Sequence, residues 1–297
     1  MKRWCIDELS EFGRQHYKNV VYVRFDRDDF VRQSFEKDYD IPRLMDTLQV
    51  HSRVQEALLA DYRNDFSKHA TDAETHYITQ IWDSVPEQLA REDKRFVHAD
   101  VGPRVRAPLL RAPIRWLDDA ALVQIVPRVK KPEMPLSAYK DGAYKMFFLD
   151  VGLLGAACKL PPSVILEGNS IFGQFKGALT EQYVQQQLRS ECSISPYYWS
   201  AERAQAEVDF LIESDYRIFP VEVKAELNLQ AKSLRSFCKR YRYPVALHIS
   251  MSSHQVSTVH IAPGKADPQG HTYTVVDIPL YAVASAPAEA GELKVET

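Results

Sequence analysis

Two short runs of alternating residues constrain the fold of this chain more than any other feature. In Glu207–Ile212, apolar side chains alternate with acidic ones, and in Val221–Lys224, valines alternate with a glutamate and a lysine. A period of two is typical of strands that bury one face. The polar segment Glu213–Arg217 between them has the length of a hairpin connection, so the sequence predicts two neighbouring antiparallel strands.

Pairing these strands would bring Asp209, Glu222 and Lys224 to one face, within several ångströms of each other. Two carboxylates at neighbouring strand positions are ligands that suit Mg²⁺ or Mn²⁺. Such a metal lowers the pKa of a bound water and neutralises charge on a phosphodiester. Lys224 would position the attacking water or stabilise the phosphate. The hairpin is therefore a candidate metal site, with Asp209 and Glu222 as ligands and Mg²⁺ or Mn²⁺ as cofactor.

An aspartate followed by a hairpin and Glu-x-Lys resembles the signature of the PD-(D/E)xK nuclease superfamily. In that superfamily a preceding helix often supplies another acid, and Glu181 within Phe175–Val184 stands at the matching place. The resemblance implies catalytic roles for Lys224 and Glu181. The alternative is structural, because Glu and Lys two residues apart are common on strands and nuclease-like folds host many functions.

Composition excludes several other classes of protein. The 297 residues are 45% hydrophobic and 26% charged, as expected for a globular chain of two or three domains. A net charge of −3 gives no overall attraction to nucleic acid. The nine histidines form no HExxH pattern, and no apolar run has membrane-spanning length. The four cysteines show no CxxC spacing, which favours reduced thiols and a cytoplasmic location: Cys5, Cys158, Cys192 and Cys238.

The N-terminal half is predicted to contain two segments. Residues 1–50 are predicted to form helix, strand and helix, with the strand at Val20–Phe25 and the second helix at Ile41–Val50. Residues 53–139 are predicted to form short helices closed by a strand, the outline of a winged helix. A helix from Arg104 to Asp119 would carry Arg104, Arg111 and Arg115 toward nucleic-acid phosphates; the alternative is a solvated face or an interdomain contact.

Residues 140–283 are predicted to form an α/β domain around the hairpin. A strand at Pro196–Trp199 precedes it, and a helix at Ala231–Cys238 and a strand at Pro244–Ser250 follow. Lys232 and Arg235 on that helix are candidate phosphate contacts, and an ordinary exposed basic face is the alternative. Asp277–Val283 is predicted to be an edge element because of Pro279. Residues 284–297 are rich in Ala, Glu and Pro and predicted to be disordered.

The order of these segments resembles a family of bacterial and archaeal proteins that join an AAA-type ATPase, a winged-helix segment and a nuclease-like domain of unknown function. The resemblance covers residues 53–283, and Val20–Phe25 resembles a strand of the ATPase. The matching runs are Ala57–Phe66, Ile81–Pro86, Phe148–Leu154, Glu207–Phe210, Val221–Lys224 and Lys232–Arg235.

The chain departs from that family where ATP would bind. No GxxxxGK[ST] run occurs, and no apolar strand ending in paired acids lies between Phe25 and Arg53. The chain is therefore expected to begin after the P-loop and to skip the second half of the ATPase. We expect no ATP site and no ATP hydrolysis, although the family is usually labelled as ATP-binding.

The sequence therefore predicts an α/β fold: a restriction-endonuclease-like mixed-sheet domain, preceded by a winged-helix-like module and a partial AAA-type α/β segment. Two functional hypotheses follow. The first is metal-dependent phosphodiester hydrolysis on nucleic acid. The second is a non-enzymatic module that recognises nucleic acid or protein, or self-associates. No membrane partner is expected.

Overall fold

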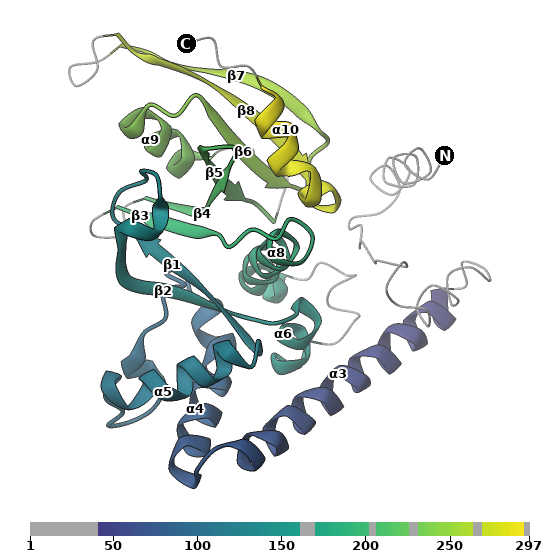
Figure 1. Cartoon of the computed structure of the whole chain (residues 1–297). Coiled ribbons are helices and arrows are strands. Elements are labelled where there is room, and N and C mark those ends of the chain that lie inside the picture. Colours follow the sequence, from purple (N-terminus) through teal and green to yellow (C-terminus); the bar gives the residue numbers. More distant parts are fainter. Residues whose placement is uncertain (1–40, 161–169, 202–205, 226–230, 264–268, 294–297) are drawn as a thin grey trace. The chain divides into compact units, whose positions relative to one another are not determined.

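The computed structural model describes residues 41–160, 170–201, 206–225, 231–263 and 269–293 (Figure 1). The strand predicted at Val20–Phe25, and with it most of the AAA-type segment, lies outside the described residues. The described residues belong to two compact units. One combines residues within 1–75 and 152–176, and the other combines residues within 76–151 and 177–297.

The first unit is dominated by α3, which runs without a break from Ile41 to His69. The sequence predicted two helices here, ending at Val50 and starting again at Val54, with a domain boundary between them. The predicted break between two helices is wrong, because residues 51–53 include neither proline nor glycine and continue the helix. The domain boundary itself stays a prediction.

Helix α4 (Asp72–Leu89) starts with a capping box. The Thr71 amide donates to the Glu74 carboxylate at 3.1 Å, and the Glu74 amide donates to the Thr71 hydroxyl at 3.4 Å. The helix continues past Pro86 to Leu89. The short helix α6 spans Val151–Ala157.

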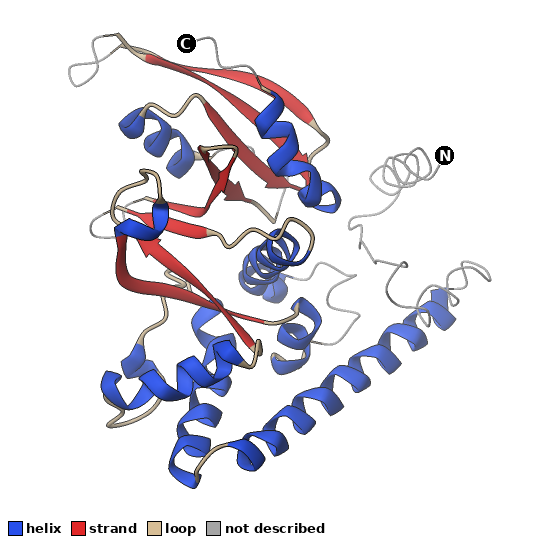
Figure 2. Ribbon diagram, in the orientation of Figure 1, coloured by secondary structure: helices blue, strands red, loops and turns tan. Residues whose placement is uncertain are grey.

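The second unit contains an eight-stranded mixed sheet (Figure 2), which confirms a mixed α/β fold. Its order is β2-β1-β3-β4-β5-β6-β8-β7, and the pairs β1–β3, β5–β6 and β6–β8 are parallel. The strands are β1 (Val123–Val129), β2 (Lys140–Phe148), β3 (Tyr197–Ser200), β4 (Glu207–Ser214), β5 (Arg217–Val223), β6 (Val245–Ser250), β7 (Gln255–Ile261) and β8 (His271–Pro279). The restriction-endonuclease-like assignment stays a prediction.

The predicted domain boundary at residue 139 falls between two strands of one hairpin. Strand β1 pairs antiparallel with β2 and parallel with β3, so the strand assigned to the winged helix is part of the large sheet. The reason is its apolar content: Val123, Val126 and Val129 are all buried, and a strand buried in this way needs neighbours on both sides.

The central hairpin β4–β5 is confirmed, and its turn is shorter than predicted. Phe210 pairs with Val221, and the ladder continues to Ser214 opposite Arg217. Only Asp215 and Tyr216 remain in the turn, with φ of 49° and 57°. Positive φ at both central residues is the backbone of a type I′ turn, whose twist matches that of paired strands.

Helices α8 and α9 are among the helices that pack on the sheet of the second unit. The apolar side of α9 (Lys232–Tyr241) buries Leu234, Phe237 and Cys238 in a core with Trp199 and Leu211. Helix α8 (Ser170–Ser190) crosses beside β4 in Figure 1, and the Gln182 side chain bonds both backbone groups of Phe148, at 2.9 and 2.7 Å. In the described residues, no helix is both long and apolar enough to cross a membrane.

Two predictions near the C-terminus are wrong. Asp277 belongs to β8, which lies between β6 and β7 rather than at an edge; Pro279 is the last residue of that strand and costs no further ladder bond. The edge strand β7 was not predicted. The tail that was predicted to be disordered is described as far as residue 293 and contains the helix α10 (Ala286–Glu292). This helix is held by the burial of Ala286 and Ala290.

Candidate functional site

The ends of β4 and β5 bring together the carboxylates that the sequence singled out. The Asp209 side chain reaches across the hairpin, where its Oδ2 accepts a hydrogen bond from the Val223 amide at 2.7 Å. Glu222 precedes that residue on β5, and its charge acts on Asp209. The structure therefore places Asp209 beside Glu222, as the predicted pairing required.

Glu222 and Lys224 form a close ion pair within the same group. Lys224 Nζ lies 2.6 Å from Glu222 Oε1, and the glutamate is only 4% exposed. The second oxygen, Oε2, is buried and has no hydrogen-bond partner among the described residues. Burial raises the pKa of Glu222, and the nearby Lys224 only partly offsets this. Burial lowers the pKa of Lys224, but the adjacent Glu222 raises it by more.

Asp209 is the carboxyl group with the least compensation. Burial raises its pKa well above the ordinary value, and the negative charges of Glu181 and Glu222 raise it further. Lys145 and Lys94 act in the opposite direction without cancelling the effect. An aspartate in this position favours either a proton or an additional cation.

Glu181 lies on α8 and is held by two lysines that the sequence analysis did not identify. Its oxygens pair with Lys94 and with Lys145, the latter at 3.4 Å. Lys145 is fully buried and pairs also with Glu207 at 2.5 Å. Burial opposes the charge of Glu181, but the two lysines outweigh it, so its pKa is lowered. Burial also opposes the charge of Lys145, whose pKa is nevertheless raised by Glu181 and Glu207.

A signal for these partners was present in the sequence. Lys145 is a charged residue directly before the apolar run Met146–Leu149 of the same strand, and a lysine in a buried strand needs an acidic partner. Glu207 lies two residues before Asp209 on the same predicted strand and therefore on the same face. Lys94 is different, because it lies in a loop whose position depends on tertiary contacts.

Two further buried polar residues continue the site across the sheet. His248 on β6 is in register with Glu222 on one side and with Asp277 on β8 on the other. The Nδ1 atom of His248 lies 2.6 Å from Oδ1 of Asp277, while its Nε2 is buried without a hydrogen-bond partner in the described part of the chain. The sequence analysis missed both residues, although polar side chains within an otherwise apolar strand were visible.

The donor set fits a hard divalent cation held by few protein ligands. No three His, Cys, Asp or Glu side chains are grouped to hold a metal ion within the described ranges. Mg²⁺ is commonly bound through one or two carboxylates and completed by water or substrate phosphates. Asp209 and Glu222 supply such carboxylates, and the unpartnered Oε2 of Glu222 agrees with this use.

The three arginines predicted on one helix do not share one. Helix α5 (Ala107–Asp119) has Pro108 in its first turn and begins three residues after Arg104. Arg104 itself has a φ of 64°, which is not a helical backbone conformation. Arg111 and Arg115 are exposed and four residues apart on α5. Arg115 Nε lies 3.4 Å from Asp119, so part of this charge is locally compensated. The predicted continuous basic face through Arg104 is therefore wrong.

Helix α9 presents a denser basic surface. Lys232 and Arg235 are both exposed, and Arg235 donates to the His260 carbonyl at 3.3 Å. The helix contains no acidic residue, and its exposed side also carries Lys239 and Arg240. The two predicted residues thus belong to a larger basic surface, hereafter the α9 surface: Lys232, Arg235, Lys239 and Arg240.

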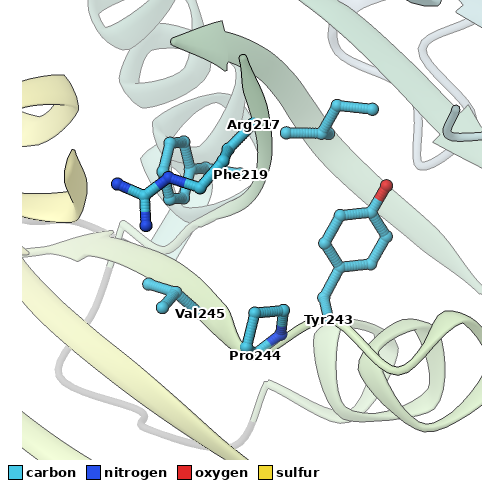
Figure 3. A pocket seen from close by; sticks show the side chains of 6 residues that line it. Arg217, Phe219, Tyr243, Pro244 and Val245 are labelled. Carbon is cyan, nitrogen blue, oxygen red and sulfur yellow. The ribbon is translucent and has the colours of Figure 1, made fainter. Parts of the chain in front are cut away.

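A cavity of about 150 Å³ lies at the other end of β5 and β6 (Figure 3). It is lined by Arg217, Ile218, Phe219, Tyr243, Pro244 and Val245. The Arg217 guanidinium donates to the carbonyls of Gly291 and Leu293. This cavity starts where β5 starts, whereas Glu222 lies near the end of that strand, so the cavity is separate from the carboxylates.

Two family models match the chain. Residues 176–281 match a domain of unknown function (DUF4143), and residues 42–164 match a second domain of unknown function (DUF8612). No curated protein matches. Neither description names an ATPase or a nuclease, so both resemblances stay predictions. The first region contains Glu181, Asp209, Glu222 and Lys224, and the second contains Lys94 and Lys145.

Proposed function

We propose that this chain is a metal-dependent phosphodiesterase that acts on nucleic acid. The observation that carries the proposal is the state of Glu222: one oxygen is 2.6 Å from Lys224, and the other is buried without a partner among the described residues. Asp209 lies alongside with its pKa raised by burial and by neighbouring carboxylates. A divalent cation would satisfy both groups at once.

Asp209 and Glu222 would hold Mg²⁺ or Mn²⁺ through carboxylate oxygens. When bound, such a cation activates water and neutralises charge on the scissile phosphate. The Val223 amide fixes Asp209, and Lys224 fixes Glu222, so both carboxylates are oriented before a cation arrives. This orientation is the contribution of the chain itself to metal binding.

Lys224 would provide a fixed positive charge beside the reacting phosphate. Its raised pKa keeps it protonated at neutral pH, so it would orient water and stabilise negative charge rather than act as a base. Glu181, kept ionised by Lys94 and Lys145, would serve as an auxiliary carboxylate whose negative charge acts on Asp209. Hydrolysis joins the water oxygen to phosphorus and breaks the bond from phosphorus to the ester oxygen, which leaves with the proton that the water gives up.

The α9 surface would bind the phosphate backbone of the substrate. It concentrates lysine and arginine without acids on one helix, whereas the whole chain has a net charge of −3. Its apolar side is already packed on the sheet, so the basic side is the one that faces outward. Backbone binding of this kind is independent of sequence and weakens as salt concentration rises.

The proposal is tested by incubating the purified chain with Mn²⁺ or Mg²⁺ and labelled single-stranded DNA, duplex DNA or RNA. We expect cleavage that chelation abolishes and that Lys224→Met slows by about 10²–10³-fold, the usual effect of losing one stabilising charge. The matched control is Asp215→Asn at the far end of the same hairpin, which should cleave as the unmodified chain does. Cleavage that persists in an Asp209→Asn, Glu222→Gln double variant would refute the proposal.

A non-enzymatic recognition module is the second candidate. It is favoured by the two lysines that engage Glu181, because buried ion pairs of this kind serve the fold without any chemistry. This role predicts nucleic-acid binding without metal-dependent cleavage. Charge reversal of Arg235 and Lys239 should then weaken binding, whereas reversal of Arg111 and Arg115 on α5 should not.

A further inference from the structure

Three polar side chains form a row across the sheet, and the first of them, Glu222, belongs to the candidate metal site. Glu222, His248 and Asp277 occupy matching register positions on the parallel strands β5, β6 and β8. Matching positions on neighbouring strands place side chains on the same face. The three residues are 4%, 2% and 7% exposed, so the whole row is shielded from solvent.

The chemistry of the row fixes where one proton lies. A carboxylate only accepts hydrogen bonds, so the 2.6 Å contact between Asp277 Oδ1 and His248 Nδ1 requires that Nδ1 carry the hydrogen. In the neutral ring, Nε2 is then an acceptor. Glu222 Oε2 is also an acceptor, and both atoms are buried without a hydrogen-bond partner in the described residues. Each of these two buried acceptors therefore requires a hydrogen-bond donor.

We propose that His248 is a positioning residue for Glu222. Asp277 orients the imidazole, and a buried water molecule donates one hydrogen to His248 Nε2 and the other to Glu222 Oε2. Buried waters commonly satisfy polar atoms in this way, and two acceptors on adjacent strands are the partners such a water needs. Its effect on metal binding rests on the function proposed above, whereas the contact itself does not.

The consequence is that both oxygens of Glu222 are held in place. Lys224 holds Oε1 at 2.6 Å, and the water would hold Oε2. A carboxylate has about four lone-pair directions, so a direction toward a cation remains available. Partners that orient a metal ligand typically change metal affinity by about 10- to 100-fold when they are removed.

The first test is calorimetric titration of Mn²⁺ into the full chain. We expect His248→Phe to weaken binding by about 10- to 100-fold. His248→Gln, whose amide oxygen can accept from the water, should recover most of the affinity. The control is His260→Phe, because His260 is exposed on β7. A His248→Phe protein that melts earlier but binds Mn²⁺ unchanged would overturn the proposal. If His248→Phe does not fold, His248→Gln and Asp277→Asn are compared instead. We then expect Asp277→Asn to weaken Mn²⁺ binding and His248→Gln to keep most of it.

The second test uses the metal-free chain and therefore separates this inference from the proposed enzyme. Nitrogen NMR of His248 should show hydrogen on Nδ1 and a bare Nε2, and Glu222→Ala should shift the Nε2 resonance. A bare Nδ1, or an Nε2 resonance that ignores Glu222→Ala, would overturn the positioning contact. The expected NMR result together with no Mn²⁺ binding by the unmodified chain would instead refute the metal site and leave the contact supported.

Discussion

Two groups of buried and half-buried carboxylates lie next to each other in this molecule and differ in how far nearby lysines compensate their charge. Glu181 and Glu207 share the buried Lys145, and Glu181 pairs with Lys94 as well. In the group of Asp209 and Glu222, the ion pair found among the described residues is the one between Glu222 and Lys224, and the other Glu222 oxygen has no partner there. We call these the paired group and the open group.

The difference appears in the direction of the pKa shifts. The pKa of Glu181 is lowered because two lysines outweigh its burial. The pKa values of Asp209 and Glu222 are raised because burial outweighs the charges around them. Burial alone therefore does not decide the role of an acid. The charge of the paired group is compensated by lysines, whereas the open group is the one that we propose to bind a cation.

The largest expected effect comes from breaking the paired group. Lys145→Met removes the shared cation and leaves the buried Glu181 and the half-buried Glu207 without it. We expect a loss of about 3–5 kcal/mol in the free energy of unfolding, as is usual when one partner of a buried ion pair is removed. Urea denaturation measures it. Lys140→Met, at an exposed position on the same strand, is the control; equal losses in the two variants would contradict the assignment.

The next effect concerns the open group and a cation. Mn²⁺ at 100 times its dissociation constant should stabilise the unmodified chain by about 2.7 kcal/mol, because it binds only the folded state. The Asp209→Asn, Glu222→Gln double variant should show no such gain. Thermal denaturation with and without Mn²⁺ gives the comparison, and an equal gain in both proteins would place any cation elsewhere.

Without metal, the open group should cost stability. The raised pKa of Asp209 means that the folded chain holds a proton that the unfolded chain has released, so stability falls as pH rises from the unfolded value through the folded one. Asp209→Asn should therefore raise metal-free stability at neutral pH by about 0.5–2 kcal/mol and flatten its decline with pH. Denaturation across pH with a chelator tests this, and a less stable variant would show that Asp209 is already compensated.

The smallest effect should come from Glu207. Its side chain is 26% exposed, and Lys145 keeps Glu181 as a partner when Glu207 is neutralised. We expect Glu207→Gln to cost about 0.5–1 kcal/mol in unfolding free energy. A loss as large as that of Lys145→Met would mean that Glu207, rather than Glu181, is the main partner of the lysine.

The open group was largely predictable from sequence because its members are local. Asp209, Glu222 and Lys224 are joined by a hairpin whose alternation fixes their face. The paired group depends on contacts between distant segments: Lys94 and Glu181 are 87 residues apart. Hydrophobic periodicity carries no information about such a pair, so the sequence analysis named Glu181 without either of its lysines.

The fold shows the same division between local and distant information. The hairpin β4–β5, the strand β3 and helix α9 follow from short patterns and were predicted. The membership of β1 in the large sheet was not, because it depends on pairing with β3, which lies some 70 residues later; Arg128 is in register with Tyr198. The composition of the tail suggested disorder, but burial of Ala286 and Ala290 decided otherwise.

The shared lysine also bears on how this protein can be divided. Lys145 belongs to the region 42–164 and Glu181 to the region 176–281, so each region carries the counter-charge of the other. If the chain were cut between β1 and β2, the C-terminal piece would lack β1, which is an inner strand of the sheet. It would also lose the apolar contacts that the buried valines of β1 make. The second compact unit is thus expected to unfold in one cooperative step.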